Sequence, residues 1–229
     1  MMDKEIKISD TKLEYKKNQL ALTTLCKNDY TLFPIFYDHY TKQGVDHFYI
    51  YYNGIITNSI KEVFSKPNVT LIQWNFRYWN PPSCKFRHCA QMGQIHNALY
   101  KYGKNVYPYM IFCDLDEYMY IPKTTIKKYI FSTNKDCYVF HNRWCKTIDD
   151  VVPKILPNKF YSSINVEPVG KRSKCIYKTD SIETLSIHFY DKVKKNITII
   201  KDLHLYHFHT WSGKRKKNLD TKYKLTYIS

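Results

Sequence analysis

Several features common in other protein classes are scarce in this sequence of 229 residues. Only six residues are glycine, too few for a collagen-like repeat, and no Cys-x-x-Cys pair occurs among the seven cysteines. An odd cysteine count argues against a disulfide framework, and Cys84, His88 and Cys89 lack the second ligand pair of a zinc finger. We therefore expect free thiols and a reducing compartment.

Long apolar segments are also missing. No apolar run approaches the roughly 20 residues that a membrane-spanning helix requires. The N-terminal segment MMDKEIKISD is polar and does not resemble a signal peptide. Hydrophobic residues make up 44% of the chain and charged residues 24%, proportions that exclude disorder and a coiled coil for the chain as a whole. From these features we expect a cytoplasmic protein.

Acidic residues are few relative to basic ones. Lys and Arg total 36 against 20 Asp and Glu, which gives a formal net charge of +16. Such an excess is typical of proteins with a polyanionic partner: nucleic acid, an anionic membrane or phosphorylated small molecules. Alanine occurs only at Ala21, Ala90 and Ala98, whereas the chain has 22 Tyr and 12 Phe. This bias indicates an AT-rich genome, bacterial or viral, which accounts for part of the lysine excess without any function.

Strand and helix patterns alternate along the first half of the chain. We expect strands over residues 20–26, 46–52, 69–74 and 108–113, and helices over 31–42, 57–65 and 85–102. Later segments are less regular, with a helix expected over 124–131 and strands at 137–141, 174–178, 185–189, 197–200 and 203–208. The alternation predicts an α/β fold: one Rossmann-like domain with a mostly parallel, mixed central sheet flanked by helices. We place this domain at residues 18–212, between a flexible N-terminal arm (1–17) and a basic C-terminal tail (213–229).

The motif Asp114-Leu-Asp116-Glu117 directly follows the most apolar expected strand. Ligands of open α/β sheets bind beyond the carboxyl ends of the strands, so this is the expected position of a site. Three carboxylates within four residues repel one another, and a divalent cation would relieve that repulsion. Oxygen ligands suit Mn²⁺ or Mg²⁺, and one or two carboxylates leave most of the coordination shell for phosphate oxygens. The alternative is an acidic turn that caps the following segment.

Paired aspartates after a strand also occur in haloacid-dehalogenase-type phosphatases, where the first is a nucleophile and the second a general acid. Asp149-Asp150 would then stand for the later metal-binding pair of that class. The class prefers Thr or Val where Tyr118 stands, and the two pairs lie too close in sequence for its intervening core. We keep it as a minor alternative.

Several short motifs occur in an order and spacing that resemble a known family. They are Asn28-Asp29, Tyr37-Asp-His-Tyr40, Gly44-Val-Asp-His-Phe-Tyr-Ile-Tyr-Tyr-Asn53, Gln91 and Met110-Ile-Phe-Cys-Asp-Leu-Asp-Glu-Tyr118. Further along the chain follow Lys171-Arg-Ser-Lys174-Cys-Ile-Tyr-Lys178, Ile187-His188-Phe189 and Leu205-Tyr-His207-Phe208. Together, from about residue 20 to residue 215, they resemble the GT-A-fold glycosyltransferases of family 92 and the related family-2-like group.

This resemblance implies a metal-dependent enzyme of glycan biosynthesis. It would move a sugar from a UDP- or GDP-type nucleotide-sugar donor to a glycan or other hydroxyl acceptor. Asp114 would lie near the ribose or the metal, and Asp116 would bind the Mn²⁺ or Mg²⁺ that acts as a Lewis acid on the leaving diphosphate. A late histidine is expected as a further metal ligand, with His207 as the first candidate and His188 as the second. A histidine on an apolar strand can equally be a core residue, and His204 and His209 are weaker candidates.

The resemblance also identifies residues for the donor and the acceptor. The donor-binding candidates, besides Asp114, are Asn28, Asp29, Asn53, Arg87, Gln91, Lys171 and Lys174. Lys171, Arg172 and Lys174 can pair with phosphate oxygens, although solvated surface charge is the alternative. Glu117 is a candidate for orienting the acceptor. The carboxylate that would deprotonate the acceptor hydroxyl stays open among Asp149, Asp150, Glu167 and Glu183.

Two positions depart from the family pattern, and one loop is ambiguous. Asp29 stands where the family prefers Glu, and Tyr52 stands where it prefers Asp, so the nucleoside of the donor is open. The aromatic segment Trp74–Trp79 is either a platform for sugar rings or part of the core, and its Arg77 is a further candidate for the diphosphate.

The rival from another functional class is a nucleic-acid-binding protein without enzymatic activity. The net charge and the basic stretch Lys214–Lys217 favour it. However, the basic residues are spread along the chain, no known nucleic-acid-binding motif occurs, and carboxylates at residues 114–117 would repel a phosphate backbone. We therefore expect no nucleic-acid partner. The basic tail is compatible with peripheral docking on an anionic membrane surface.

Overall fold

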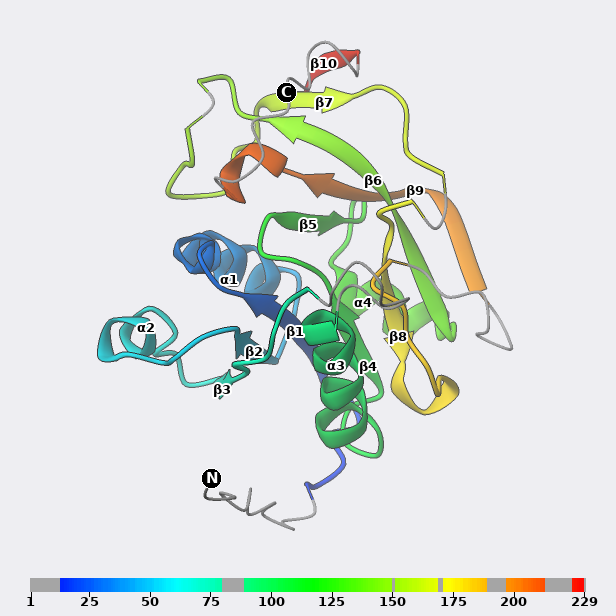
Figure 1. The fold of residues 1–229 in the computed structure, drawn as a ribbon. Helices are drawn as coiled ribbons and strands as arrows, with labels where there is room; N and C mark the ends of the chain where they lie inside the picture. The colour runs from blue at the N-terminus through cyan, green and yellow to red at the C-terminus, as the bar shows by residue number, and fades with distance from the viewer. Residues whose placement is uncertain are drawn as a thin grey trace.

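The computed structural model describes residues 13–79, 89–149, 151–168, 171–188, 197–212 and 224–228. Within these segments, one sheet has the strand order β10-β7-β6-β8-β4-β1-β2-β3, with β9 paired to β6 and β5 paired to β9 (Figure 1). Four of these strands pair in parallel, in the order β3-β2-β1-β4. This order matches the first half of a doubly wound nucleotide-binding sheet.

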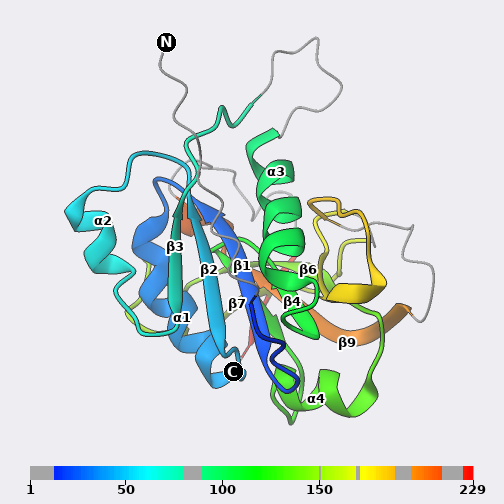
Figure 2. The same cartoon turned by 90° about the horizontal axis from the view of Figure 1, so that it is seen from below.

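The parallel part confirms the alternation expected from the sequence. Its strands are β1 (Leu20–Cys26), β2 (His47–Tyr52), β3 (Val69–Gln73) and β4 (Tyr109–Phe112). Its helices are α1 (Phe33–Lys42), α2 (Asn58–Val63) and α3 (Cys89–Asn97), and α3 continues as a π-helical turn, Ala98–Gly103. Figure 2 shows β3, β2 and β1 side by side, with α3 running next to β1 on the side of β4.

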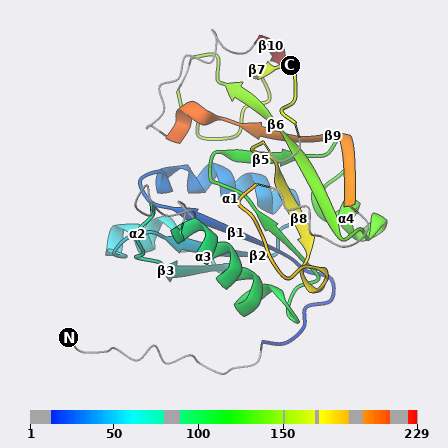
Figure 3. The same cartoon turned by 45° about the vertical axis from the view of Figure 1, so that its right-hand side comes forward.

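Each face of the parallel strands is covered, because alternate side chains point to opposite faces of a strand. From β1, Leu20 and Leu22 pack with the α1 residues Phe33 and Phe36 in one core cluster. Ala21, between them in sequence, packs in a second cluster with the apolar side chains of α3 and its π-helical extension. Helices α1 and α3 accordingly lie on opposite sides of β1 (Figure 3). This confirms an α/β fold with a central mixed sheet flanked by helices.

The second half of the chain extends the sheet with mainly antiparallel pairings. Its elements are β5 (Glu117–Tyr120), α4 (Ile126–Thr133), β6 (Cys137–Lys146), β7 (Phe160–Ser163), β8 (Lys174–Lys178), β9 (Ile197–His207) and β10 (Leu225–Ile228). Strands β5, β7 and β10 were not expected from the sequence. The two strands expected at 197–200 and 203–208 are one strand, β9, and residues 185–188 of the strand expected at 185–189 are irregular. Strand β10 lies within the segment that we expected to be a basic tail, and it pairs with β7.

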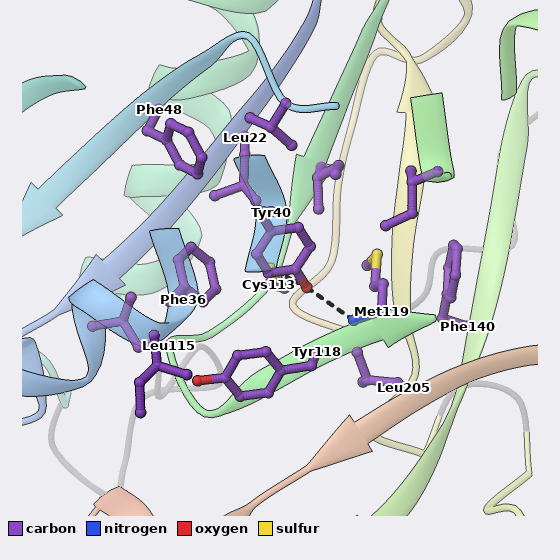
Figure 4. Packing of buried hydrophobic residues seen from close by; sticks show 14 of the residues in the cluster. Leu22, Phe36, Tyr40, Phe48, Cys113, Leu115, Tyr118, Met119, Phe140 and Leu205 are labelled. Atoms are coloured by element: carbon purple, nitrogen blue, oxygen red, sulfur yellow. Dashed lines mark hydrogen bonds between the residues drawn. The ribbon is translucent and has the colours of Figure 1, made fainter. Parts of the chain in front are cut away.

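A buried cluster fixes the backbone around the acidic motif (Figure 4). Leu115 and Tyr118 are fully buried and point into the core beside Phe36 of α1. The Tyr40 hydroxyl donates to the Glu117 carbonyl (3.0 Å) and accepts from the Met119 amide (3.0 Å). The start of β5 is therefore tied to α1, with the apolar residues of the motif in the core.

Two expectations about the chain as a whole can be compared with the described residues. Among these, the cysteines are free and buried, as expected: Cys26, Cys113, Cys137, Cys145 and Cys175. In the same part of the chain, no helix has the length and apolar character needed to cross a bilayer.

Candidate active site

The acidic motif forms a tight turn between β4 and β5, at the carboxyl edge of the parallel strands. The Glu117 amide donates to the Asp114 carbonyl (3.1 Å), and the Asp114 amide donates to Glu117 Oε2 (2.8 Å). Burial raises the pKa of Glu117, whose side chain is 1% exposed. The Glu117 side chain therefore stabilises the turn from its buried side and does not face an acceptor in solvent.

Both carboxylate oxygens of Asp114 are engaged by other side chains. Lys174 Nζ lies 2.9 Å from Asp114 Oδ2, and Gln91 Nε2 donates to Asp114 Oδ1 (3.0 Å). Lys174 Nζ is also 3.5 Å from Glu117 Oε2. Burial by itself lowers the pKa of Lys174, but the Asp114 and Glu117 carboxylates more than offset this and raise it. Lys174 is therefore a buried cation that lies between two of the three acids of the motif and offsets part of their charge.

The strand register explains why Lys174 reaches the motif. Strand β8 runs antiparallel to β4, with Cys175 opposite Phe112, so the preceding Lys174 lies beside the end of β4. We expected Lys174 to face donor phosphates, but its ammonium group lies among carboxylates and its side chain is only 3% exposed.

Asp116 faces a different partner, His207. His207 lies opposite Glu117 in the pairing of β5 with β9 and opposite Trp144 in the pairing of β6 with β9. Its Nε2 atom is 3.4 Å from Asp116 Oδ2. The Phe208 amide donates to the Asp116 carbonyl (2.9 Å), which holds the two segments together. The late histidine that ranked first in the sequence is thus adjacent to the second aspartate.

The electrostatics of this pair are coupled. Burial disfavours charge on both groups, yet their mutual attraction wins: Asp116 raises the pKa of His207, and His207 lowers the pKa of Asp116. A positive charge is therefore favoured at or between His207 Nε2 and Asp116 Oδ2.

The donor atoms fit a divalent cation with two protein ligands. Adjacent ligands of an octahedral metal with bonds of about 2.1 Å lie about 3 Å apart, close to the separation of Asp116 Oδ2 and His207 Nε2. Within the described residues, no three His, Cys, Asp or Glu side chains form a group that could hold a metal. Asp114 and His188 therefore do not complete a set of three with this pair. The remaining ligands would have to come from a substrate or water.

Two of the predicted donor-binding residues, Asp29 and Gln91, interact with this turn, and a third, Asn53, contacts the aromatic segment. The pKa of Asp29 is raised by burial, with smaller contributions from the charges of Asp116 and Asp114, so the charges of the motif act on Asp29. Gln91 links Asp114 to the aromatic segment, since the Tyr78 hydroxyl donates to Gln91 Oε1 (3.2 Å). Asn53 is buried and donates from Nδ2 to the carbonyls of Trp74 and Phe76, so it shapes that segment.

Other candidates have different surroundings. Asn28 and Lys171 are exposed, and exposed Asp149 accepts a hydrogen bond from the Val151 amide within its own loop. Glu167 is buried in an ion pair with Arg172 (3.0 Å), and Glu183 is exposed. Arg87 and Asp150 lie outside the described residues.

One residue of the site was missed in the sequence. Asn142 of β6 is fully buried, and its Oδ1 atom lies 3.0 Å from His207 Nδ1. The available signal was the polar stretch His141-Asn-Arg143 inside an otherwise apolar strand, since a buried amide requires hydrogen-bonding partners.

Comparison with known proteins gives one family match. The family model described as glycosyltransferase family 92 matches residues 27–228. No curated protein matches the chain. The chain resembles the crystal structure of HddC from Yersinia pseudotuberculosis with 13% identity and a TM-score of 0.46, over 85% of this chain and 96% of that one.

Two mannosyltransferase structures are also similar in part. Core-mannan synthase A (CmsA/Ktr4) from Aspergillus fumigatus, in its Mn/GDP form, is 14% identical with a TM-score of 0.38, over 60% of this chain and 45% of that one. Ktr4p from S. cerevisiae, in complex with GDP, is 12% identical with a TM-score of 0.36, over 54% and 40%. This chain therefore covers less than half of either mannosyltransferase chain.

Proposed function

Because the chain belongs to glycosyltransferase family 92, we propose that it uses a divalent cation held by Asp116 and His207 to transfer a sugar from a nucleoside diphosphate sugar. The membership itself confirms the expected enzyme class, a glycosyltransferase. The cation, the donor and the residues that hold them are our proposal.

The observation that carries the proposal is the contact between His207 Nε2 and Asp116 Oδ2, at 3.4 Å. A neutral imidazole nitrogen facing a carboxylate oxygen presents one lone pair to another. A proton or a metal ion between them removes the repulsion. Imidazole and carboxylate together are ligands that suit Mn²⁺, while Mg²⁺ prefers oxygen, so we propose Mn²⁺ as the better match to this pair.

When bound, the metal would supply Lewis-acid stabilisation of the diphosphate leaving group. The chain's own residues prepare the site for it. Lys174 pairs with Asp114 and lies close to Glu117, whereas the ion-pair partner of Asp116 among the described residues is His207, not a lysine or arginine, and Asp116 directs its carboxylate at the cation. Asp29 and the part of Asp114 that stays accessible face the same locus, and we assign them to hydroxyl groups of the donor. The Asp114 side chain is 34% exposed, which leaves room for such a contact.

Several parts of the proposal rest on the sequence expectation alone. The donor nucleoside is UDP- or GDP-type, and the acceptor is a glycan or another hydroxyl compound. Peripheral contact of the basic C-terminal segment with an anionic membrane is compatible with such an acceptor.

A thermal-shift experiment tests the proposal. Addition of UDP or GDP with Mn²⁺ at 100 times the dissociation constant is expected to stabilise the protein by about 2.7 kcal/mol, a rise in Tm of about 5–10 °C. Asp116→Asn should lose the metal-dependent part of the shift. Asp38→Asn is the matched control, because Asp38 pairs with Lys42 on the outer surface of α1. A metal-dependent shift that survives in Asp116→Asn, or no shift with any nucleotide and metal, contradicts the proposal.

A further inference from the structure

Asn142 connects His207 to a buried ion pair on the far side of the site. Its Oδ1 atom is 3.0 Å from His207 Nδ1, and its Nδ2 atom donates to Glu167 Oε2 (3.1 Å). The backbone supports the same arrangement, because the Glu167 amide donates to the Asn142 carbonyl (3.0 Å). Asn142 is 0% exposed and Glu167 is 6% exposed, so water does not compete for these contacts.

Arg172, at the far end of this chain of contacts, determines which groups in it donate hydrogen bonds and which accept them. Arg172 Nη1 donates to both oxygens of Glu167 (3.0 and 3.2 Å), so both oxygens of that carboxylate act as acceptors. The Asn142 amide must therefore direct its NH₂ group towards Glu167 and its oxygen towards His207. A further acceptor, Glu117 Oε1, lies 3.7 Å from the same ring nitrogen. His207 Nδ1 consequently carries a proton, both in the cation and in the neutral form that these contacts favour.

The position of this proton determines what the other ring nitrogen, Nε2, can bind. With the proton on Nδ1, the Nε2 atom of neutral His207 presents its lone pair to the locus shared with Asp116. This is the form of histidine that a metal requires. The opposite tautomer would place an N–H bond where the cation binds.

Two further contacts hold the ring and its partners in place. Trp144 stacks on His207, with ring centroids 4.6 Å apart and an interplanar angle of 29°. Arg172 lies over the Trp144 ring at 5.2 Å, so it contacts both Trp144 and Glu167. Arg172 has a φ of +61°, a left-handed conformation that is unfavourable for a non-glycine residue. The contacts with Glu167 and Trp144 offset this cost and fix the guanidinium group.

We propose that Asn142 is a positioning residue that holds His207 in the Nδ1–H tautomer, with Glu167 and Arg172 fixing the direction of the Asn142 amide. This rests on the proposed function in so far as the purpose of the tautomer is metal binding. The tautomer itself is independent of any metal, nucleotide or sugar.

Nitrogen-15 NMR of the metal-free protein, labelled at histidine, tests the tautomer directly. Long-range proton–nitrogen correlations across a pH titration are expected to show that neutral His207 carries its proton on Nδ1. Asn142→Leu, which has a similar volume but no hydrogen-bonding groups, should lose this preference. A wild-type His207 with the proton on Nε2, or an unchanged tautomer in Asn142→Leu, overturns the proposal even if the enzyme binds metal and transfers sugar.

Manganese affinity, measured from the free Mn²⁺ signal in electron paramagnetic resonance, gives the second reading. Loss of an outer hydrogen-bonding partner of a metal ligand typically weakens binding about 10- to 100-fold, which we expect for Asn142→Leu. Asn142→Asp keeps an acceptor for His207 Nδ1 but loses the donor to Glu167, so we expect the acceptor to be displaced and binding to weaken as well. In Asn142→Asp the new carboxylate opposes Glu167. The double variant Asn142→Asp with Glu167→Gln restores a donor opposite an acceptor at unchanged net charge, and should recover most of the affinity.

The matched control is Asn68→Leu. Asn68 also uses its amide for two hydrogen bonds, to Tyr37 and to the Asp46 carbonyl, but it lies beside β3. This variant should lose stability and keep its Mn²⁺ affinity. Wild-type affinity in Asn142→Leu, or a double variant no better than Asn142→Asp, contradicts the positioning role. Failure of the wild-type protein to bind Mn²⁺ at all would instead refute the proposed metal and leave the NMR test of the tautomer in force.

Discussion

The two aspartates of the Asp114–Glu117 turn are two residues apart and have opposite surroundings. Asp114 follows β4, in the parallel half of the sheet, and a buried lysine and a glutamine amide hold its two oxygens. Asp116 precedes β5, in the antiparallel half, and faces the imidazole of His207. Asp114 is already paired with a cation of the protein, the ammonium group of Lys174. Asp116 and His207 leave room for a bound cation.

This difference shows that the residue types of an acidic motif do not by themselves assign its ligands. Two buried carboxylates beside a third that is partly exposed would be strongly destabilising without compensation, since desolvation and mutual repulsion both disfavour their charge. Lys174 compensates Asp114 and Glu117 permanently. The charge of Asp116 is left to His207 and to the proposed metal, so this is the charge that a ligand can modulate.

The largest effect is expected from removing the permanent cation. Lys174→Met leaves Asp114 and Glu117 buried without their counter-charge, and breaking a buried pair in this way costs about 3–5 kcal/mol of unfolding free energy. Urea denaturation measures the loss. Lys178→Met, on the same strand, removes only a contact with Asn134 and serves as the control. Wild-type stability in Lys174→Met would contradict the role of Lys174 as the counter-charge of the motif.

A slightly smaller effect on stability is expected from a change in pH, because the titratable residue His39 contacts β5. Burial lowers the pKa of His39, whose Nε2 atom contacts the Met119 carbonyl (3.0 Å), from 6.5 to about 4. Between these values the unfolded chain binds a proton that the native protein does not, so stability is complete above about pH 6.5 and falls as the pH drops. The full loss is about 3 kcal/mol, since one pKa unit corresponds to about 1.36 kcal/mol.

Comparison of urea denaturation at pH 7 and pH 4.5 checks this prediction. His39→Gln keeps a donor for the Met119 carbonyl but does not titrate, so the difference in stability between the two pH values should shrink relative to wild type. Equal differences in the two proteins would show that His39 does not carry the effect.

The smallest effect is expected on the Asp114 side, where only one hydrogen bond is removed. Gln91→Leu deprives Asp114 of an amide donor and Tyr78 of its acceptor. At about 1 kcal/mol for one hydrogen bond, we expect about a fivefold rise in KM for the donor and an unchanged Mn²⁺ affinity. Steady-state kinetics measure the first and metal titration the second. Gln73→Leu, on the exposed side of β3, is the control. A large loss of Mn²⁺ affinity in Gln91→Leu would erase the distinction between the two aspartates.

The sequence predicted the parallel half of the fold well, because apolar runs such as residues 20–26 and 108–113 are buried on both faces and stand out locally. It did not predict β5, since Glu117–Tyr120 is a strand only through its pairing with β9 and its packing on α1. Strands β7 and β10 are short and pair with each other, so their local signal is weak.

The sequence predicted which residues form the site better than it predicted how they are arranged. Asp114, Asp116, Glu117, Gln91, Lys174 and His207 were all named, and the fold brings them together. Their roles depend on contacts between residues far apart in sequence, such as those of Lys174 with Asp114 and of Asn142 with His207, which no local pattern encodes. Asn142 was missed for the same reason: its importance lies in the direction of one amide group between His207 and Glu167, both far from it in sequence.

The most direct test of the account is Mn²⁺ binding to wild type, Asp114→Asn and Asp116→Asn, followed by the free Mn²⁺ signal in electron paramagnetic resonance. If Lys174 neutralises Asp114 while Asp116 and His207 hold the metal, Asp116→Asn should weaken binding by more than the about 100-fold that loss of an outer partner can cost. Asp114→Asn should stay within about tenfold of wild type, the lower end of that range. Loss of binding in Asp114→Asn with retention in Asp116→Asn would contradict the account.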